Sequence, residues 1–293
     1  MKSRHNSAVF MAILAAALYA ISSPFSKILL NKISPTMMAG LLYLGAGIGM
    51  SIIALFRYKT GKYKKEMSLT KKEMPYTIGM VVLDILAPIF LMIGLTMTSP
   101  ENVSLLNNFE IVATSIIALL IFKESISKRL WIAIVLITIS SIVLSIEDIS
   151  SFSFSFGSIF VLLACVSWGF ENNCTRMLSI KDPLQVVVIK GFGSGLGSLL
   201  IAFFIGDTCN DITYIIYTLL LGFVAYGLSI FFYVYSQREL GAAKTSAYYA
   251  IAPFIGALLS FVIFFEIPTI LFVIAFIIMI FGTYFASIDT NNQ

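Results

Sequence analysis

Long apolar runs separated by short polar segments fill almost the whole chain. Each run holds about 20 residues, the length that an α-helix needs to cross a hydrocarbon core of about 30 Å. Ten such runs predict helices, at residues 8–30, 35–57, 75–97, 101–122, 129–146, 156–178, 184–205, 213–236, 243–264 and 267–288. The pattern therefore predicts an all-α polytopic membrane protein with ten transmembrane helices.

The composition supports lipid as the solvent of this chain. Hydrophobic residues make up 59% and charged residues 12% of the sequence, whereas soluble domains carry about 25% charged residues. The net charge of +4 is small and scattered, which argues against a nucleic-acid partner. The first run continues to about Leu30 without a small-x-small cleavage site, so we expect a retained first helix rather than a cleaved signal peptide.

The basic residues predict the orientation in the membrane, because cytoplasmic loops carry an excess of Lys and Arg. With the N-terminus inside, sixteen of the nineteen basic residues fall on the inner side. Seven of them lie in the long loop of residues 57–74. Lys27 and Lys32 fall outside, and Lys190 lies within a helix. We therefore expect a multi-pass protein of the cell inner (plasma) membrane with both termini cytoplasmic.

Two stretches of the chain repeat each other. The glycine pattern of residues 45–49 recurs at residues 193–197, and Ser34-Pro35 matches Asp182-Pro183 at the same shift. The chain therefore divides into two five-helix halves, residues 1–150 and 151–293. Because five is an odd number, the halves would enter the membrane in opposite orientations, as inverted repeats. Many secondary transporters have this arrangement, with the substrate site near the midplane between the halves.

The second half also resembles a known family. Its residues 235–243, followed by Ser246, Tyr249, Pro253, Ala257 and Glu266, are similar to the second repeat of EamA-type proteins of the drug/metabolite transporter superfamily. Trp168-Gly169 fits the family pattern, whereas Tyr19 replaces the tryptophan that is usual in the first helix. The resemblance covers nearly the whole chain. It implies a ten-helix inner-membrane transporter that exports amino acids or other small metabolites, and it does not name the substrate.

Polar residues inside the predicted helices are the candidates for a substrate site or pathway. A charged residue at the centre of the bilayer costs about 2.5–3.5 kcal/mol even on insertion scales, so these side chains are expected to face a cavity or another helix. Several share one helical face by their i, i+3, i+4 spacing. The candidates are Asp84, Asn107, Glu110, Trp168, Glu171, Asn172, Lys190, Tyr226 and Tyr249.

Glu171 and Lys190 flank the polar turn of residues 179–183. At a rise of about 1.5 Å per residue, both charges would lie roughly 10–15 Å from that turn and at similar depth. A structural ion pair, a role in substrate binding or gating, and no mutual contact all remain open. In the repeat, Ile21 or Ser22 is the first-half position that corresponds to Glu171, and Leu42 is the position that corresponds to Lys190. This asymmetry favours a role in substrate chemistry.

The sequence shows no signature of an enzyme. His5 is the single histidine, and no metal-ligand spacing, Ser–His pairing or phosphate loop occurs. We therefore expect no catalytic residues, no metal and no cofactor. A non-transporting membrane scaffold and an intramembrane enzyme built from scattered Asp and Glu are the less favoured alternatives.

The sequence thus predicts a secondary active transporter that exports a small metabolite, in the first place an amino acid, by alternating access. Its expected partners are the small-molecule substrate, the lipid bilayer and protons as a coupling ion, which Glu110 or Glu171 would carry. A monomer is favoured. The alternative function is export of lipophilic cationic drugs, in which the carboxylates would bind the charge of the drug.

Overall fold

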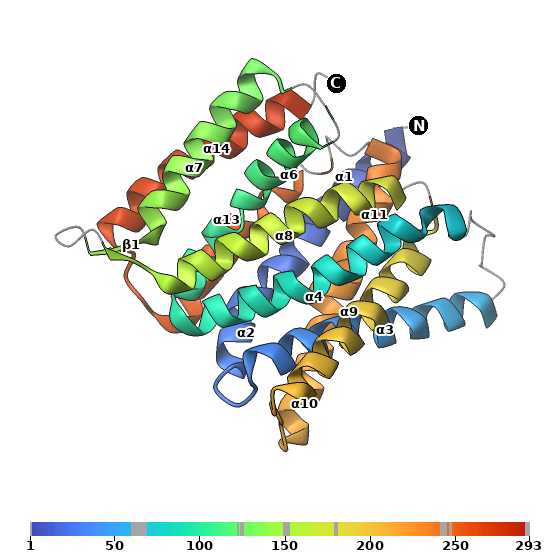
Figure 1. Cartoon of the computed structure of the whole chain (residues 1–293). Coiled ribbons are helices and arrows are strands. Elements are labelled where there is room, and N and C mark those ends of the chain that lie inside the picture. Colours follow the sequence, from blue (N-terminus) through green and yellow to red (C-terminus); the bar gives the residue numbers. More distant parts are fainter. Residues whose placement is uncertain are drawn as a thin grey trace.

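The computed structural model describes residues 2–59, 69–121, 123, 126–148, 153–178, 181–240, 245 and 248–290. Within these ranges the protein is a bundle of helices, as predicted (Figure 1). The described strands are β1 (Ile146–Asp148) and β2 (Ser153–Phe154), which form a small antiparallel pair between the two halves of the sequence. Residues 60–68 of the basic loop lie outside the described residues.

The first half of the chain forms eight described helical elements. They are α1 (Lys2–Ala20), α2 (Ser22–Leu29), α3 (Pro35–Lys59), the 3₁₀ turn η1 (Lys71–Glu73), α4 (Met74–Met97), α5 (Pro100–Leu106), α6 (Phe109–Leu120) and α7 (Lys128–Ser145). Pro35 and Pro100 occupy first helical positions, where the missing N–H costs little.

The second half forms seven further described helical elements. They are α8 (Phe156–Leu178), α9 (Pro183–Phe204), α10 (Ile212–Gly222), the π-helical turn η2 (Phe223–Leu228), α11 (Ser229–Leu240), α13 (Ala252–Phe264) and α14 (Ile270–Thr290). The predicted helix 243–264 begins among residues that are outside the described ranges, apart from Thr245 and residues 248–251.

Three predicted helices are interrupted within the described residues, and in the predicted helix 243–264 the interruption is the turn at residues 250–251 before α13. The predicted helix 8–30 breaks at Ile21 between α1 and α2. Pro24 explains this break, because it has no N–H for the carbonyl of Ala20 and its ring crowds that carbonyl. The predicted helix 101–122 breaks at Asn107-Asn108 between α5 and α6. Asparagine side chains compete with helical backbone hydrogen bonds, and the bond from Glu110 N to Asn107 O spans only three residues.

Seven helical segments of the described chain are long and apolar enough to cross a membrane. The residues 252–264 and 270–286 form shorter apolar helices. The helix α8 falls outside this set because Glu171, Asn172 and Asn173 lower its mean hydropathy. These helices indicate a polytopic membrane protein, while the number of ten spans stays a prediction.

Gly45, Gly47 and Gly49 form one glycine triplet, and Gly193, Gly195 and Gly197 form the other. The helices that carry these triplets pack closely against their neighbours. A Cβ atom on Gly191 would lie 2.4 Å from the backbone nitrogen of Gly47, so α3 and α9 pack backbone to backbone. The outer glycines of the two triplets have matching neighbours. Gly45 and Gly49 face Leu219 and Phe223, which are four residues apart. In the same way, Gly193 and Gly197 face Val81 and Ile85 on α4.

Candidate functional site

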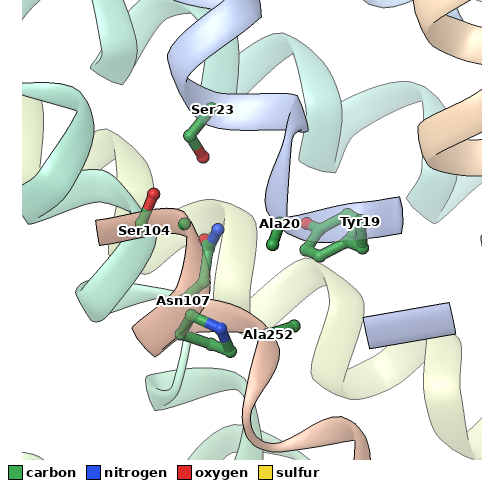
Figure 2. A pocket seen from close by; sticks show the side chains of 8 residues that line it. Tyr19, Ala20, Ser23, Ser104, Asn107 and Ala252 are labelled. Atoms are coloured by element: carbon green, nitrogen blue, oxygen red, sulfur yellow. The ribbon is translucent and has the colours of Figure 1, made fainter. Parts of the chain in front are cut away.

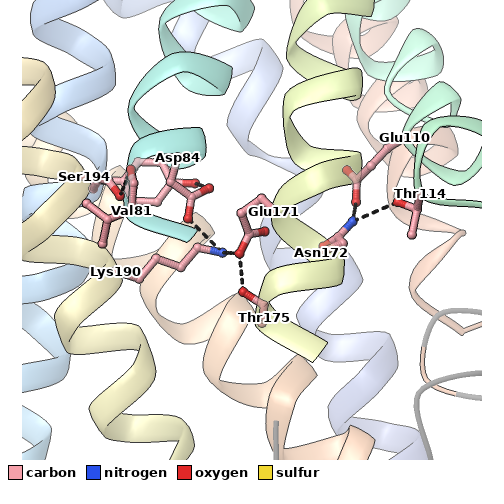
Figure 3. Close-up of polar contacts among 10 residues, drawn as sticks. Val81, Asp84, Glu110, Thr114, Glu171, Asn172, Thr175, Lys190 and Ser194 are labelled. Atoms are coloured by element: carbon pink, nitrogen blue, oxygen red, sulfur yellow. Dashed lines mark hydrogen bonds and ion pairs between the residues drawn. The ribbon is translucent and has the colours of Figure 1, made fainter. Parts of the chain in front are cut away.

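A cluster of three charged side chains lies inside the bundle. Lys190 of α9 places its Nζ 3.1 Å from Asp84 Oδ2 of α4 and 3.0 Å from Glu171 Oε1 of α8 (Figure 3). Asp84 is 0% exposed, Glu171 2% and Lys190 6%. Of the alternatives left open for Glu171 and Lys190, absence of contact is therefore excluded, and Asp84 joins the pair from a third helix.

The cluster has more negative than positive charge. Two carboxylates share one ammonium, so the three fully ionised groups sum to one negative charge. Tyr43 donates a hydrogen bond of 2.9 Å to Asp84 Oδ1, and Thr175 donates one to Glu171 Oε1. These hydroxyl donors stabilise carboxylate charge, but they do not neutralise it. A proton or a positively charged group is therefore the natural complement of this cluster.

A group of tyrosines extends from the charge cluster. The ring of Tyr43 lies 5.2 Å from that of Tyr226, and the ring of Tyr226 lies 5.8 Å from that of Tyr19. Tyr249 follows, with its ring 5.9 Å from that of Tyr19. Ser22 donates a hydrogen bond of 3.3 Å to the hydroxyl of Tyr226. Aromatic side chains thus connect Asp84 with the break between α1 and α2.

Glu110 lies in a separate polar contact. Asn172 Nδ2 donates to Glu110 Oε1, and the same nitrogen lies 3.3 Å from Thr114 Oγ1 (Figure 3). This contact joins α6 to the face of α8 next to Glu171. Trp168, one turn before Asn172, is 6% exposed and belongs to the hydrophobic core. Glu110 and Glu171 are therefore held by different partners.

A small cavity lies where the helix breaks meet. Its volume is about 10 Å³, which is room for about one water molecule. Its lining includes Tyr19, Ala20, Ser23, Ser104, Asn107 and Gly256. In Figure 2 the side chains of Ser23, Ser104 and Asn107 gather around this space. Asn107 is thus the predicted site residue that lines the cavity.

The sequence pattern did not single out all the polar residues around the charge cluster. Tyr43 contacts Asp84 directly, yet a tyrosine in an apolar helix has no distinctive spacing. Thr175 follows Glu171 by one turn, and its spacing places it on the same polar helical face as Trp168, Glu171 and Asn172, although the candidate set leaves it out. In the sequence, Ser22 stands out only as one of the two positions that correspond to Glu171 in the repeat.

The sequence profile of the EamA-like transporter family matches this chain twice, at residues 6–146 and 155–288. The chain belongs to the EamA-like transporter family. The resemblance inferred from the motifs of the second half is thereby confirmed. The gap between the two matched ranges, residues 147–154, contains the predicted boundary at residue 150, and the division into two domains stays a prediction.

Two relatives of this EamA-like protein are described as transporters. One is an uncharacterized transporter of Methanothermobacter thermautotrophicus, 25% identical over 288 residues, which cover 93% of this chain and 83% of the relative. The other is the uncharacterized transporter YyaM of Bacillus subtilis, 25% identical over 182 residues, which cover 58% of this chain and 59% of the relative. The family and these relatives indicate a transporter without naming its substrate.

A solved crystal structure shares the fold of this EamA-like protein. It superposes with a TM-score of 0.71 and covers 98% of both chains at 14% sequence identity. At this low identity the similarity concerns the arrangement of the helices alone.

Proposed function

We propose that this EamA-like protein is a secondary active transporter that exports a small metabolite, in the first place an amino acid, by alternating access. The buried cluster of Asp84, Glu171 and Lys190 carries this proposal. Charged side chains inside transmembrane helices mark substrate and proton pathways. Here they join α4 of the first half to α8 and α9 of the second half. Because the cluster lies between the two halves, a movement of one half against the other would change the contacts among its charges.

The helix contacts support two halves related by a two-fold axis. The second helix of each half packs against its counterpart, α3 against α9, and the fifth helix does the same, α7 against α14. The contact of α4 with α8 is matched by that of α11 with α1. The glycine triplets have equivalent neighbours in both halves. These relations fit inverted repeats that rock about a central site.

The transport cycle proposed here uses the charge cluster as its bistable element. Rocking of one half against the other separates or rearranges the Lys190–Asp84 contact, which leaves a buried charge without its partner. A proton on a carboxylate, or a positive group of the substrate beside it, would lower that cost in one state. A ligand shifts the equilibrium only by such differential contacts. Where a proton is this complement, substrate movement is coupled to the proton gradient.

The excess of carboxylates favours a substrate with a positive group. The ammonium of an amino acid satisfies this condition, and so does a lipophilic cationic drug. Because Lys190 already contacts two carboxylates, we assign it to holding the cluster rather than to binding the carboxylate of a substrate. A resistance assay with cationic dyes in expressing cells separates the two substrate classes.

The proposed orientation places both termini in the cytoplasm at the inner membrane. The described ends of α1 and α14 lie at the same end of the molecule (Figure 1), as an even number of spans requires. The excess of Lys and Arg on that side agrees with the positive-inside rule.

The direct test is efflux from proteoliposomes against a panel of amino acids. We expect at least one amino acid to leave the vesicles faster with the protein than without it. Lys190→Ala, which leaves Asp84 and Glu171 without their shared cation, is expected to lose this transport. Glu110→Gln tests separately the predicted role of Glu110 as a proton carrier, and the amount of folded protein in the vesicles is measured for both variants. If no amino acid is transported and cells gain dye resistance instead, the cationic-drug alternative is favoured.

A further inference from the structure

Two polar contacts join the halves at the end of the bundle where α4 begins, which is also the end at which α1 begins (Figure 1). Lys181 Nζ lies 3.2 Å from Glu73 Oε1, and the backbone nitrogen of Leu69 donates a hydrogen bond of 2.9 Å to Gln185 Oε1. Leu69 and Glu73 precede α4, whereas Lys181 and Gln185 lie at the turn between α8 and α9. We propose that these four residues form the gate that opens the transport pathway on this side of the membrane.

The inference deepens the proposed function and rests on it, because a gate has a role only if the halves alternate between two open states. Such alternation needs contacts between the halves that break at one end of the molecule. Ion pairs that water can reach contribute little to stability, and Lys181 and Glu73 keep 10% and 18% of their side chains exposed. This pair is therefore inexpensive to break, unlike the buried charge cluster of Asp84, Glu171 and Lys190.

Glu73 is positioned by its own segment of the chain. Its Oε2 accepts hydrogen bonds from the backbone nitrogen of Thr70 at 2.8 Å and from the Thr70 hydroxyl at 2.7 Å. These bonds are part of a capping box, and they leave Oε1 for Lys181. The segment before α4 thus presents a carboxylate oxygen to the opposite half without depending on that contact for its own structure.

The turn between α8 and α9 is organised locally as well. The backbone nitrogen of Leu184 donates to Asp182 Oδ1 at 2.9 Å where α9 begins. The backbone nitrogen of Lys181 donates to the carbonyl of Leu178 at 2.9 Å where α8 ends. Both sides of the gate therefore keep their structure when the contacts between them break, so that opening costs only the contacts across the gate.

An apolar layer lies beneath the polar contacts. Met80 of α4, Leu178 of α8 and Val186 of α9 are 0%, 0% and 1% exposed, and they form one hydrophobic cluster against which Leu69 packs. The same three helices carry the charge cluster. At a rise of about 1.5 Å per residue, Leu178 lies roughly 10 Å from Glu171 along α8. The path between these helices from the gate to the charge cluster is closed in this structure.

Cys174 is a natural reporter between the gate and the charge cluster. It lies on α8 between Glu171 and Leu178, is partly buried and packs against the same hydrophobic cluster. Its Sγ lies 3.1 Å from the position that a Cβ atom on Gly79 of α4 would take, so the thiol faces the contact between α4 and α8. Separation of these helices at the gate would admit water, and a water-soluble reagent, to this thiol.

The test is the rate at which a charged, membrane-impermeant methanethiosulfonate modifies Cys174 in the full-length protein in lipid nanodiscs. Cys165→Ala and Cys209→Ser leave Cys174 as the only thiol, since the chain has three cysteines. In this background, Glu73→Gln removes the charge of the gate and keeps an amide oxygen for the capping box. We expect it to react about two- to fivefold faster than the protein with the intact gate.

Further variants assign the effect to the contact between Glu73 and Lys181. Lys181→Gln should accelerate the reaction as much as Glu73→Gln does, and the double variant should add little, because both substitutions remove the same contact. Lys71→Gln is the matched control, because Lys71 is exposed on the turn that holds Glu73; it should leave the rate unchanged. Unchanged reactivity in Glu73→Gln, or equal acceleration by Lys71→Gln, would overturn the gate.

A second thiol separates opening of the gate from unfolding. Cys165 is 0% exposed and contacts the carbonyl of Leu106 in the core. With Cys165 as the only thiol, Glu73→Gln should not change the rate, and equal acceleration there would mean unfolding and overturn the gate. The assay needs no substrate. Accelerated labelling of Cys174 in a protein that transports no tested amino acid would therefore refute the proposed substrate and support the gate.

Discussion

Lys190 of α9 and Asp84 of α4 form a buried ion pair with 3.1 Å between Nζ and Oδ2. The two residues belong to different ranges of the family profile, so the pair ties one half of the sequence to the other. Glu171 contacts the same ammonium from α8 at 3.0 Å. Any relative motion of these three helices must change the neighbourhood of these charges.

Replacing Lys190 by methionine should destabilise the protein strongly. The substitution keeps most of the side-chain volume but leaves two buried carboxylates without their cation. Loss of one partner of a buried ion pair costs about 3–5 kcal/mol. Reversible unfolding in detergent, monitored by tryptophan fluorescence or circular dichroism, measures this loss. The control is Lys32→Met at an exposed position, and equal effects of the two substitutions would contradict the account.

Replacing Tyr43 by phenylalanine should weaken the cluster more selectively. The change removes the hydroxyl that donates to Asp84 Oδ1 at 2.9 Å and leaves the ring in place. A hydrogen bond to a charged group contributes about 1.5–3 kcal/mol, so the free energy of unfolding should fall by about that amount. Tyr284→Phe is the matched control, because Tyr284 is 59% exposed. A Tyr43→Phe protein as stable as this control would show that the hydrogen bond contributes nothing.

Adding a methyl group at Gly191 should disrupt the contact between α3 and α9. The new Cβ would lie 2.4 Å from the backbone nitrogen of Gly47, and backbone cannot move aside without shifting a helix. Overpacking of this kind costs about 1–3 kcal/mol or more. Gly79→Ala provides the comparison, because its Cβ would meet only the Cys174 sulfur at 3.1 Å. Thermal unfolding of both variants should give a clearly lower Tm for Gly191→Ala, and the reverse order would contradict the packing described.

The sequence pattern predicted most helices of this fold, because the length and apolarity of each run define a span. It did not predict the breaks at Ile21 and at Asn107-Asn108, since the apolar pattern continues through both. Pro24 was the local signal for the first break. Such breaks depend on backbone hydrogen bonds that neighbouring helices must replace.

The candidate site was predictable only in part. Similar depth in adjacent helices was enough to suggest the contact between Glu171 and Lys190. That Asp84 completes the cluster depends on the packing of α4 between α8 and α9, which the spacing within one helix does not encode. Glu110 has the features of a proton carrier in sequence, yet it lies in its own contact with Asn172. The assignment of a transport role to each of these residues stays a prediction.

An ion pair at the edge of the bundle should contribute little to stability. Lys181 Nζ lies 3.2 Å from Glu73 Oε1, with 10% and 18% of the two side chains exposed. Ion pairs that water can reach contribute little, because water and salt screen them. Glu73→Gln should therefore lower the free energy of unfolding far less than Lys190→Met, and the difference should shrink as salt is added. A loss of stability as large as that expected for Lys190→Met would mean that this ion pair is one of the main contacts that hold the two halves together.

The central claim is that the charge cluster couples substrate movement to protons, and transport in proteoliposomes under an imposed pH gradient tests it most directly. Efflux of a transported amino acid should accelerate when protons flow in the opposite direction, and Asp84→Asn, which removes the excess negative charge, should abolish this response. Efflux by the unmodified protein that is indifferent to the pH gradient would contradict the claim.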